Sequence, residues 1–250
     1  DITSNLDMWF TMNADKYSST TIYNSTGGAN ATLVNGASIV SNDITPGPGN
    51  GYLSVNAASS QYVTLPPITF SSNTGLTFAL WVRSSGSSSP SHIFSSGKTN
   101  AVAEDISNNI IIYIGSNILN VSVRLNQTGG DYNLSTGINV NDNVWRHFVW
   151  TIDPTGIWNT YINGVLLTTK LDGVYPLLTT RTSNFIGRSN WNTDPYFNGG
   201  IDDFRIYYRT LTPTDISTLY SLPTIYYPFE TSQVSGTTVG EYSTGESVFN

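Results

Sequence analysis

The sequence predicts an all-β fold, a sandwich or barrel built from many short strands. Turn-forming residues recur about every ten positions, and the segments between them alternate apolar and polar side chains. Only 11% of the residues are charged, against roughly 25% in an average soluble domain, so Ser, Thr, Asn and Gly supply much of the polarity. This composition is typical of a β-protein with polar turns and a neutral surface that forms hydrogen bonds.

The expected strands follow one another through most of the chain. They fall within residues 51–66, which hold two, and within residues 75–84, 91–97, 109–115, 119–127 and 144–153. The segment IWNTYINGVLLTTK, residues 157–170, carries Asn163-Gly164 between two alternating apolar runs. Both residues tolerate the positive φ of a type I′ turn, so this segment is predicted to be a β-hairpin.

One short helix is predicted near the C-terminal end, over residues 213–220. Thr212 can cap this helix, Pro213 takes the first helical position, and Asp215 stands three residues after the cap. Pro223 prevents the helix from continuing.

The bulk composition excludes several classes of function. The net charge is −7 and ten basic residues are spread over 250 positions, so neither nucleic acid nor an anionic membrane surface is an expected partner. No apolar run approaches the roughly 20 residues of a membrane-spanning helix, so membrane insertion is not expected. The absence of cysteine excludes disulfides and thiol catalysis. Asp1 opens a polar stretch unlike a signal peptide, and we interpret the chain as an excerpt of a larger or processed protein.

Two stretches go beyond a general β-pattern. Residues 144–167, VWRHFVWTIDPTGIWNTYINGVLL, resemble the W-x-H and Y-hydrophobic-N-G block of laminin-G-like, concanavalin A-like lectin and glucanase domains. Residues 185–220, FIGRSNWNTDPYFNGGIDDFRIYYRTLTPTDISTLY, resemble the closing block of the same family, and LTFALWVRS at 76–84 fits its early strand. The resemblance implies a jelly-roll β-sandwich of two antiparallel sheets, with one short helix near the C-terminal end.

The opening strand has a counterpart near the end of the chain. Residues 6–13, LDMWFTMN, and residues 225–229, IYYPF, share the same alternation and lie about one module of the resembled family apart. We therefore predict a module over residues 1–221, a linker at 222–224 and the start of a following tandem repeat at 225–250. The alternative is that the second run is an extra strand of the same sandwich, followed by a tail.

The sequence offers little for catalysis. Polysaccharide-cleaving enzymes on this fold place two carboxylates on one strand face, typically as Glu-x-Asp-x-(x)-Glu, and none of the four Glu residues of this chain forms that motif. In the resembled family the position of His147 is a buried packing residue, and His92 has no nucleophile motif nearby. A carboxylate pair from separate strands stays open as an alternative, but the main expectation is that the protein is not an enzyme.

Calcium is the cofactor that the resemblance implies, in a structural role. Members of the family often bind Ca²⁺ through an acidic or amide residue after the opening strand and an Asp in the I-D-D strand, which correspond here to Asn13 and to Asp202 or Asp203. Carboxylate and amide oxygens suit this cation, and Asn13 in place of the more usual Asp would lower the charge of the site. In the alternative, Asp203 only pairs with Arg205 or caps a loop.

The candidate ligand-binding loop is SNWNTDPYFNGG, residues 189–200. Trp191 and Tyr196 offer aromatic faces that could stack on a sugar ring, while Asn192 and Asp194 offer groups for its hydroxyls. The alternative is that Trp191 folds back and covers the end of the sandwich.

The sequence therefore favours a non-enzymatic recognition or adhesion module of an extracellular, cell-surface or virion-surface protein. Its expected partners are glycans or another host or cell-surface partner, together with neighbouring repeats of the same protein. A structural spacer or fibre repeat without a ligand is the second hypothesis. A polysaccharide-degrading enzyme is the third.

Overall fold

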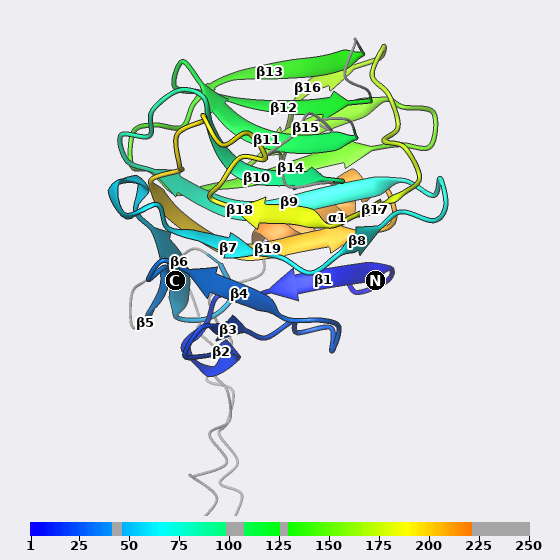
Figure 1. Cartoon of the computed structure of the whole chain (residues 1–250). Helices are drawn as coiled ribbons and strands as arrows, with labels where there is room; N and C mark the ends of the chain where they lie inside the picture. Colours follow the sequence, from blue (N-terminus) through cyan, green and yellow to red (C-terminus); the bar gives the residue numbers. More distant parts are fainter. Residues whose placement is uncertain (42–46, 99–107, 126–129, 222–250) are drawn as a thin grey trace, which may run out of the picture.

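The computed structural model describes residues 1–41, 47–98, 108–125 and 130–221, and these form a two-layered β-sandwich (Figure 1). Both large sheets are antiparallel, and α1 (Pro213–Ser221) is the single α-helix among the described residues. The predicted all-β jelly-roll sandwich with one short helix near the C-terminal end is thus confirmed. The predicted linker at 222–224 and the repeat start at 225–250 lie outside the described residues.

Sheet A contains eight of the described strands, in the order β16-β15-β14-β9-β19-β6-β5, with β1 paired to β19. Its strands are β1 (Leu6–Phe10), β5 (Ser38–Ser41), β6 (Gly51–Val55), β9 (Leu76–Ser84), β14 (Arg146–Ile152), β15 (Trp158–Ile162), β16 (Val165–Lys170) and β19 (Gly199–Tyr207).

Sheet B contains nine of the described strands, in the order β13-β12-β11-β10-β18-β7-β4-β3-β2. Its strands are β2 (Tyr17–Ser18), β3 (Thr21–Ile22), β4 (Ala31–Val34), β7 (Tyr62–Thr64), β10 (Ser91–Gly97), β11 (Asn109–Gly115), β12 (Ile118–Arg124), β13 (Asp131–Asn139) and β18 (Ser183–Ile186). A small third sheet pairs β8 (Ile68–Thr69) with β17 (Thr180–Arg181), and two 3₁₀ turns, η1 (Ala14–Lys16) and η2 (Ala57–Ser59), complete the described elements.

The hydrophobic core fills the space between the inner faces of the two sheets. Phe78 of β9 packs against Trp150 of the same sheet and against Phe94 of sheet B, with ring centroids 5.4 Å apart in both pairs. All three rings are fully buried. Because successive side chains of a strand point to opposite faces, the alternation seen in the sequence sorts these residues inward and their neighbours outward.

The predicted hairpin is present between β15 and β16. Asn163 and Gly164 have φ of 51° and 79°, the positive values that a type I′ turn requires at both central positions. The strands on either side pair in antiparallel register from Ile162 and Val165 outward. Local turn chemistry was therefore sufficient to place this element.

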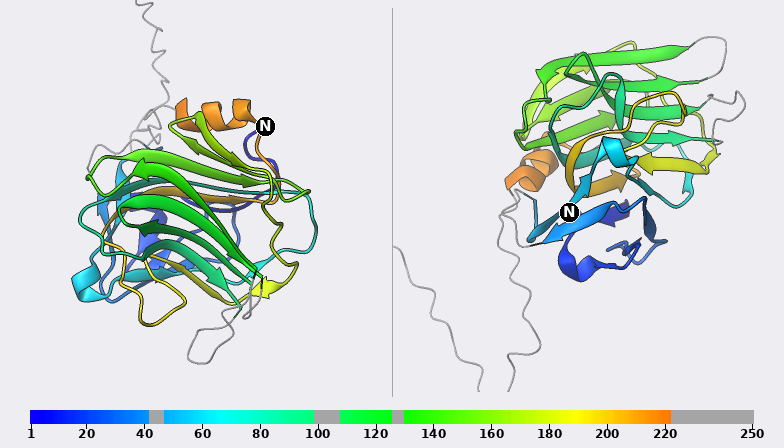
Figure 2. Two further views of the ribbon diagram at one scale, coloured as in Figure 1. Left: turned by 90° about the horizontal axis from the view of Figure 1, so that it is seen from above. Right: turned by 60° about the vertical axis from the view of Figure 1, so that its left-hand side comes forward.

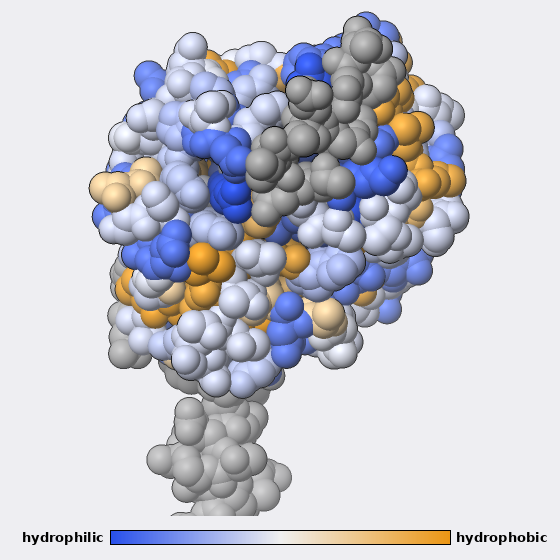
Figure 3. All heavy atoms as spheres, in the orientation of Figure 1, coloured by the Kyte–Doolittle hydropathy of each residue, from blue (hydrophilic) through white to orange (hydrophobic). Residues whose placement is uncertain are grey.

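The surface agrees with the low charge of the sequence. The side seen in Figure 3 is mostly hydrophilic or intermediate in hydropathy, with hydrophobic residues in separate patches. Large exposed apolar side chains include Val165 and Leu166 of the edge strand β16. Within the described ranges, no helix has the length and apolar character needed to cross a bilayer.

Helix α1 lies outside the two layers, against the outer face of sheet A (Figure 2). Ile216 and Leu219 of the helix are buried with Ala79 and Val149 of the sheet. Burying two such side chains contributes about 2 kcal/mol each, so packing on the sheet stabilises a helix of only two turns.

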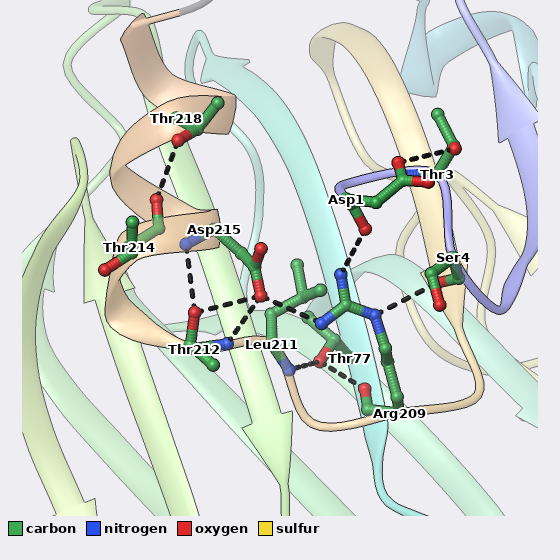
Figure 4. A network of polar contacts seen from close by, with 10 residues as sticks. All are labelled: Asp1, Thr3, Ser4, Thr77, Arg209, Leu211, Thr212, Thr214, Asp215 and Thr218. Carbon is green, nitrogen blue, oxygen red and sulfur yellow. Dashed lines mark hydrogen bonds and ion pairs between the residues drawn. The ribbon is translucent and has the colours of Figure 1, made fainter.

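A capping box starts the helix, as predicted (Figure 4). The Thr212 hydroxyl accepts a hydrogen bond from the Asp215 amide at 3.1 Å, and the Asp215 carboxylate accepts one from the Thr212 amide at 3.0 Å. Arg209 donates to the same carboxylate at 2.8 Å and to the carbonyls of Asp1 and Ser4 at 3.0 Å each. One guanidinium therefore ties the start of the chain to the start of the helix.

Candidate ligand-binding site

A pocket of about 260 Å³ lies on the outer face of sheet B. Residues of strands β10 to β13 line its floor, and residues of the loop between β18 and β19 line one wall. Figure 1 shows this loop running in front of sheet B. We call it the Trp191 pocket, and it is lined by Pro90, His92, Ile111, Tyr113, Ser122, Arg124, Asp131, Asn133, Trp191 and Asp194.

The register of sheet B arranges the floor of the Trp191 pocket. Ile111 of β11 stands opposite Ser122 of β12, which in turn stands opposite Asn133 of β13. Directly opposed residues share a face, so these three side chains form one row across three strands. Arg124 and Asp131 are likewise opposed, and their side chains form an ion pair at 2.8 Å.

The wall of the pocket is anchored by Asn190, which is 1% exposed. Its Nδ2 donates to Ser95 Oγ and to Asn109 Oδ1, each at 2.9 Å, and to the carbonyl of Ser183 at 3.2 Å. These acceptors belong to three strands of sheet B. A buried amide with this many partners holds the loop against the sheet, because releasing it would leave polar groups unsatisfied.

Trp191 and Asp194 are oriented by Ser189, the residue before the anchor Asn190. The Ser189 hydroxyl donates to Asp194 Oδ2 at 2.7 Å and accepts from the Trp191 amide at 2.9 Å. The Trp191 ring lies edge-on to His92, with centroids 5.8 Å apart, and the Arg124 guanidinium lies 5.6 Å from its centre. The indole is thus held in place but stays partly exposed on the pocket side.

Burial controls the protonation of the groups beside Trp191. Desolvation lowers the pKa of His92 to about 3, so this imidazole is neutral at pH 7 although its Nε2 lies 3.3 Å from Asp194 Oδ2. Desolvation raises the pKa of Asp194, against the lowering effect of the Ser189 hydrogen bond. Burial, and then the charge of Asp131, raise the pKa of Tyr113, which keeps its hydroxyl as a donor. The pocket therefore combines aromatic faces with donors and acceptors suited to a polyhydroxylated ligand.

The structure brings two of the four predicted ligand residues into this pocket, Trp191 and Asp194. Asn192 lies outside the lining, and its Oδ1 accepts a hydrogen bond from Arg188 at 2.9 Å. Tyr196 packs against Tyr62, with ring centroids 6.0 Å apart.

Sequence reasoning missed the floor of the pocket, including Tyr113, Arg124 and Asp131. The outward positions of Tyr113 and Arg124 could be read from the alternation of the predicted strands. Asp131 belongs to β13, which was not among the predicted strands. The order of the strands in sheet B, which places these side chains next to one another, could not be read from the sequence.

A β-bulge turns both candidate calcium carboxylates to the outer face of sheet A. The register of β19 against β9 shifts between Asp202 and Arg205, and Asp203 has φ of 49°. Asp203 Oδ1 accepts hydrogen bonds from Trp9 Nε1 at 2.6 Å and from Arg205 Nε at 2.9 Å, and both members of the ion pair are 2% exposed. Asp203 is thus in the Arg205 pairing that the sequence left open as the alternative to a metal ligand.

Asn13 and Asp202 fit an oxygen-ligated cation better. Asn13 Nδ2 donates to the carbonyl of Pro48 at 3.1 Å, and its buried Oδ1 has no hydrogen-bond partner among the described residues. A Cβ at Gly49 would overlap the Asn13 amide and one at Gly47 would overlap the Asp202 carboxylate, so one stretch of backbone closely approaches both side chains. The described part of the chain holds no group of three His, Cys, Asp or Glu that could bind a metal by themselves.

Comparison with known proteins shows which of them share this fold. No curated protein matches the sequence. Among solved structures, domain 4 of the extracellular GH43 arabinanase AbnA from Geobacillus stearothermophilus, in complex with arabinotriose, is 21% identical with a TM-score of 0.65, covering 86% of this chain and 98% of that domain.

Two toxin binding domains, each longer than this chain, share the fold over part of their length. The binding domain of Paraclostridial Mosquitocidal Protein 1 is 18% identical, with a TM-score of 0.60 over 88% of this chain and 52% of that one. The binding domain of Botulinum Neurotoxin DC, in complex with SialylT, is 20% identical, with a TM-score of 0.56 over 88% and 52%. This chain therefore spans about half of each toxin binding domain.

A family model shows to which protein superfamily the chain belongs. The model described as the concanavalin A-like lectin/glucanases superfamily matches residues 56–217, which include five of the eight strands of sheet A, six of the nine strands of sheet B, the Trp191 pocket and the start of α1. The chain belongs to the concanavalin A-like lectin/glucanase superfamily.

Proposed function

We propose that this chain is a non-enzymatic glycan-recognition module that binds a sugar in the Trp191 pocket. The observation that carries the proposal is the composition of the pocket, where the Trp191 and Tyr113 rings stand beside the Arg124–Asp131 pair and Asp194. Aromatic faces stack on the apolar faces of sugar rings, while carboxylates, guanidinium and amides bind their hydroxyls.

The relatives support a sugar as the class of ligand. The arabinanase domain is in complex with arabinotriose, and the neurotoxin binding domain with SialylT. We extend this to the setting of the protein: an extracellular recognition or adhesion module on a cell or virion surface, beside neighbouring repeats of the same protein. Its partner would be a glycan, free or carried by a host or cell-surface molecule.

Calcium is the second part of the proposal, in a structural role. Asn13 and Asp202 would hold the ion through side-chain oxygens near the backbone of residues 47–49. Their placement beside one backbone segment supports this assignment. A hard cation bound there would fix that segment to β19 and to the end of the opening strand.

A glycan array with the 1–250 chain, run with calcium and with a chelator, tests the proposal. We expect retention on a narrow set of sugars, reduced at least about tenfold by Trp191→Ala, which removes the stacking surface. Tyr23→Ala is the matched control, because Tyr23 is an aromatic residue that is 41% exposed and does not line the pocket. Melting curves would verify that each variant is folded.

Two outcomes would overturn the recognition proposal. A blank array under both conditions, with folded protein, would favour the structural spacer. Release of reducing ends from a polysaccharide, abolished by Asp194→Asn, would favour an enzyme, because Asp131 and Asp194 are two carboxylates lining one pocket.

A further inference from the structure

Three long side chains stand in a row on the outer face of sheet A, two residues along their strands from the Trp81 and His147 rings that Tyr220 of α1 contacts. They are Tyr52 of β6, Arg83 of β9 and Trp145, which directly precedes β14. Gly200 of β19 lies in the middle of the row, where it pairs with Arg83. A Cβ at Gly200 would lie 2.8 Å from the Trp145 ring and 2.9 Å from the Tyr52 ring. The missing side chain therefore lets the two rings meet edge to face, with centroids 5.5 Å apart.

The ring pair holds the Arg83 guanidinium in place. Its Cζ lies 5.0 Å from the centre of the Tyr52 ring and 4.9 Å from that of Trp145, within the range of a cation–π interaction. Contacts to ring faces leave the N–H edges of a guanidinium available for a ligand. Gly200, Tyr52 and Trp145 thus orient a cation without neutralising it.

Arg83 differs from every other arginine of the chain. Four of the others form ion pairs with carboxylates, and two donate hydrogen bonds to carbonyl or amide oxygens: Arg124, Arg146, Arg205 and Arg209 in the first group, Arg181 and Arg188 in the second. Among the described residues, no carboxylate pairs with Arg83 and no protein oxygen accepts from it. A guanidinium that two rings hold in place, and that has no carboxylate partner among the described residues, can bind an anion.

A pocket of about 140 Å³ opens beside the guanidinium. Its lining contains no carboxylate and consists of Tyr52, Ser54, Val55, Asn56, Arg83, Ser85, Asn143, Asn198 and Gly199. The adjacent Asp142 is bound by both terminal nitrogens of Arg146, at 2.7 and 2.6 Å, so its charge is already paired. We call this the Arg83 pocket; its cation and its neutral amides and hydroxyls distinguish it from a surface with a net charge of −7.

We infer that the Arg83 pocket is a second binding site, which takes the carboxylate or sulfate group of an acidic sugar. The planar fork of a guanidinium matches two oxygens of either group. Amide and hydroxyl side chains around it are suited to the neighbouring sugar hydroxyls. The volume is well below the roughly 300–1,000 Å³ of drug-sized pockets, so the site takes one charged terminal unit rather than a length of chain.

NMR titration of the full ¹⁵N-labelled chain tests this inference. The probes are glucuronate and glucosamine 6-sulfate at constant ionic strength, with glucose as the neutral control. We expect saturable shifts of the Trp145 indole N–H and the Asn143 and Asn198 side-chain amides with at least one acidic sugar, and none with glucose. The response of each probe separates a carboxylate site from a sulfate site.

Substitutions then assign the effect to the guanidinium. Arg83→Gln is expected to weaken binding at least about tenfold, since a charge-assisted fork is lost, and Arg83→Lys to weaken it less because the charge is kept. Arg188→Gln is the matched control, because that guanidinium also lies over two rings, 5.1 Å from Tyr62 and 4.6 Å from Phe185. Its titration should equal that of the unaltered chain.

Three results would overturn the inference: no saturable shift with either acidic sugar, unchanged binding by folded Arg83→Gln, or an equal response to N-acetyl-aspartate, which carries a carboxylate but no sugar. The Arg83 and Trp191 pockets share no lining residue. A blank result for one therefore leaves the test of the other intact.

Discussion

At the scale of single residues, Asp203 and Arg205 form a buried ion pair on the outer face of sheet A. Each side chain is 2% exposed, and Asp203 also accepts a hydrogen bond from Trp9. A buried charge is tolerated only while its partner is present. Asp203 therefore matters for stability whether or not calcium is bound nearby.

We expect Asp203→Asn to lower the free energy of unfolding by about 3 kcal/mol, because it leaves Arg205 buried without a counter-charge. Urea denaturation at pH 7 would measure the change. Asp172→Asn is the control, since Asp172 pairs with Lys170 in solvent and its side chain is 88% exposed. Equal effects of the two substitutions would contradict the interpretation.

Both histidines make stability depend on pH. Burial lowers the pKa of His92 to about 3 and that of His147 to about 4, whereas an unfolded histidine has a pKa near 6.5. Below pH 6.5 the unfolded chain takes up protons that the folded chain does not, so this contribution is complete above that pH and is lost as the pH falls. The slope is up to about 1.4 kcal/mol per pH unit for each histidine.

His147→Phe should flatten this dependence between pH 6.5 and 5, where most carboxylates stay ionised. The substitution keeps an aromatic ring beside Trp81 and Tyr220, whose ring centroids lie 5.1 and 6.1 Å from that of His147. Unfolding free energies measured at several pH values would show the difference. An unchanged slope would mean that His147 is not buried in its neutral form.

At the scale of elements, the start of α1 combines a cap with an ion pair. The Arg209 guanidinium, as the largest influence, lowers the pKa of Asp215 to about 2, and hydrogen bonds from Thr212 act in the same direction. A depressed carboxyl pKa stabilises the fold above the unfolded pKa near 3.9, and this contribution is lost as the pH falls towards 2.

Asp215→Asn is expected to cost about 1 kcal/mol at pH 7, since it weakens both the capping box and the pair with Arg209. The deficit should shrink as the pH falls from 4 towards 2. Denaturation curves at both ends of that range would test it. Thr214→Ala is the matched control, because Thr214 contributes only its backbone carbonyl to the network (Figure 4).

At the scale of the whole molecule, bound calcium would make the melting temperature depend on metal concentration by mass action. We expect a chelator to lower it and added Ca²⁺ to raise it for the 1–250 chain. Asn13→Ala should abolish the response, because it removes one side-chain oxygen of the proposed site. A melting temperature that chelation does not move would reject the calcium proposal.

The predicted module boundary can be tested in the same way. If residues 1–221 are a complete module, a chain ending at Ser221 should melt at the same temperature as the 1–250 chain. A clear loss of stability on truncation would instead favour the alternative, in which residues 225–229 add a strand to this sandwich. Calorimetry of both chains would distinguish the two.

Much of the fold was predictable because its signals are local. The Asn163-Gly164 turn, the capping box of Thr212 and Asp215, and the alternation within strands each depend on a few adjacent residues. Backbone preferences and short-range hydrogen bonds act at this distance along the chain. The resemblance of residues 144–167 and 185–220 to the lectin and glucanase superfamily then predicted the jelly-roll sandwich, and the family model confirms this resemblance.

The candidate sites depended on the tertiary structure. Trp191 and Asp194 were foreseen as loop residues, but their partners Tyr113 and Arg124 reach them only through the order and register of β11 and β12. The Arg83 pocket likewise requires β6, β9, β14 and β19 to lie side by side. Alternation assigns each residue to a face of its own strand. Only the pairing of distant strands, decided by burial of the shared core, determines which side chains meet on that face.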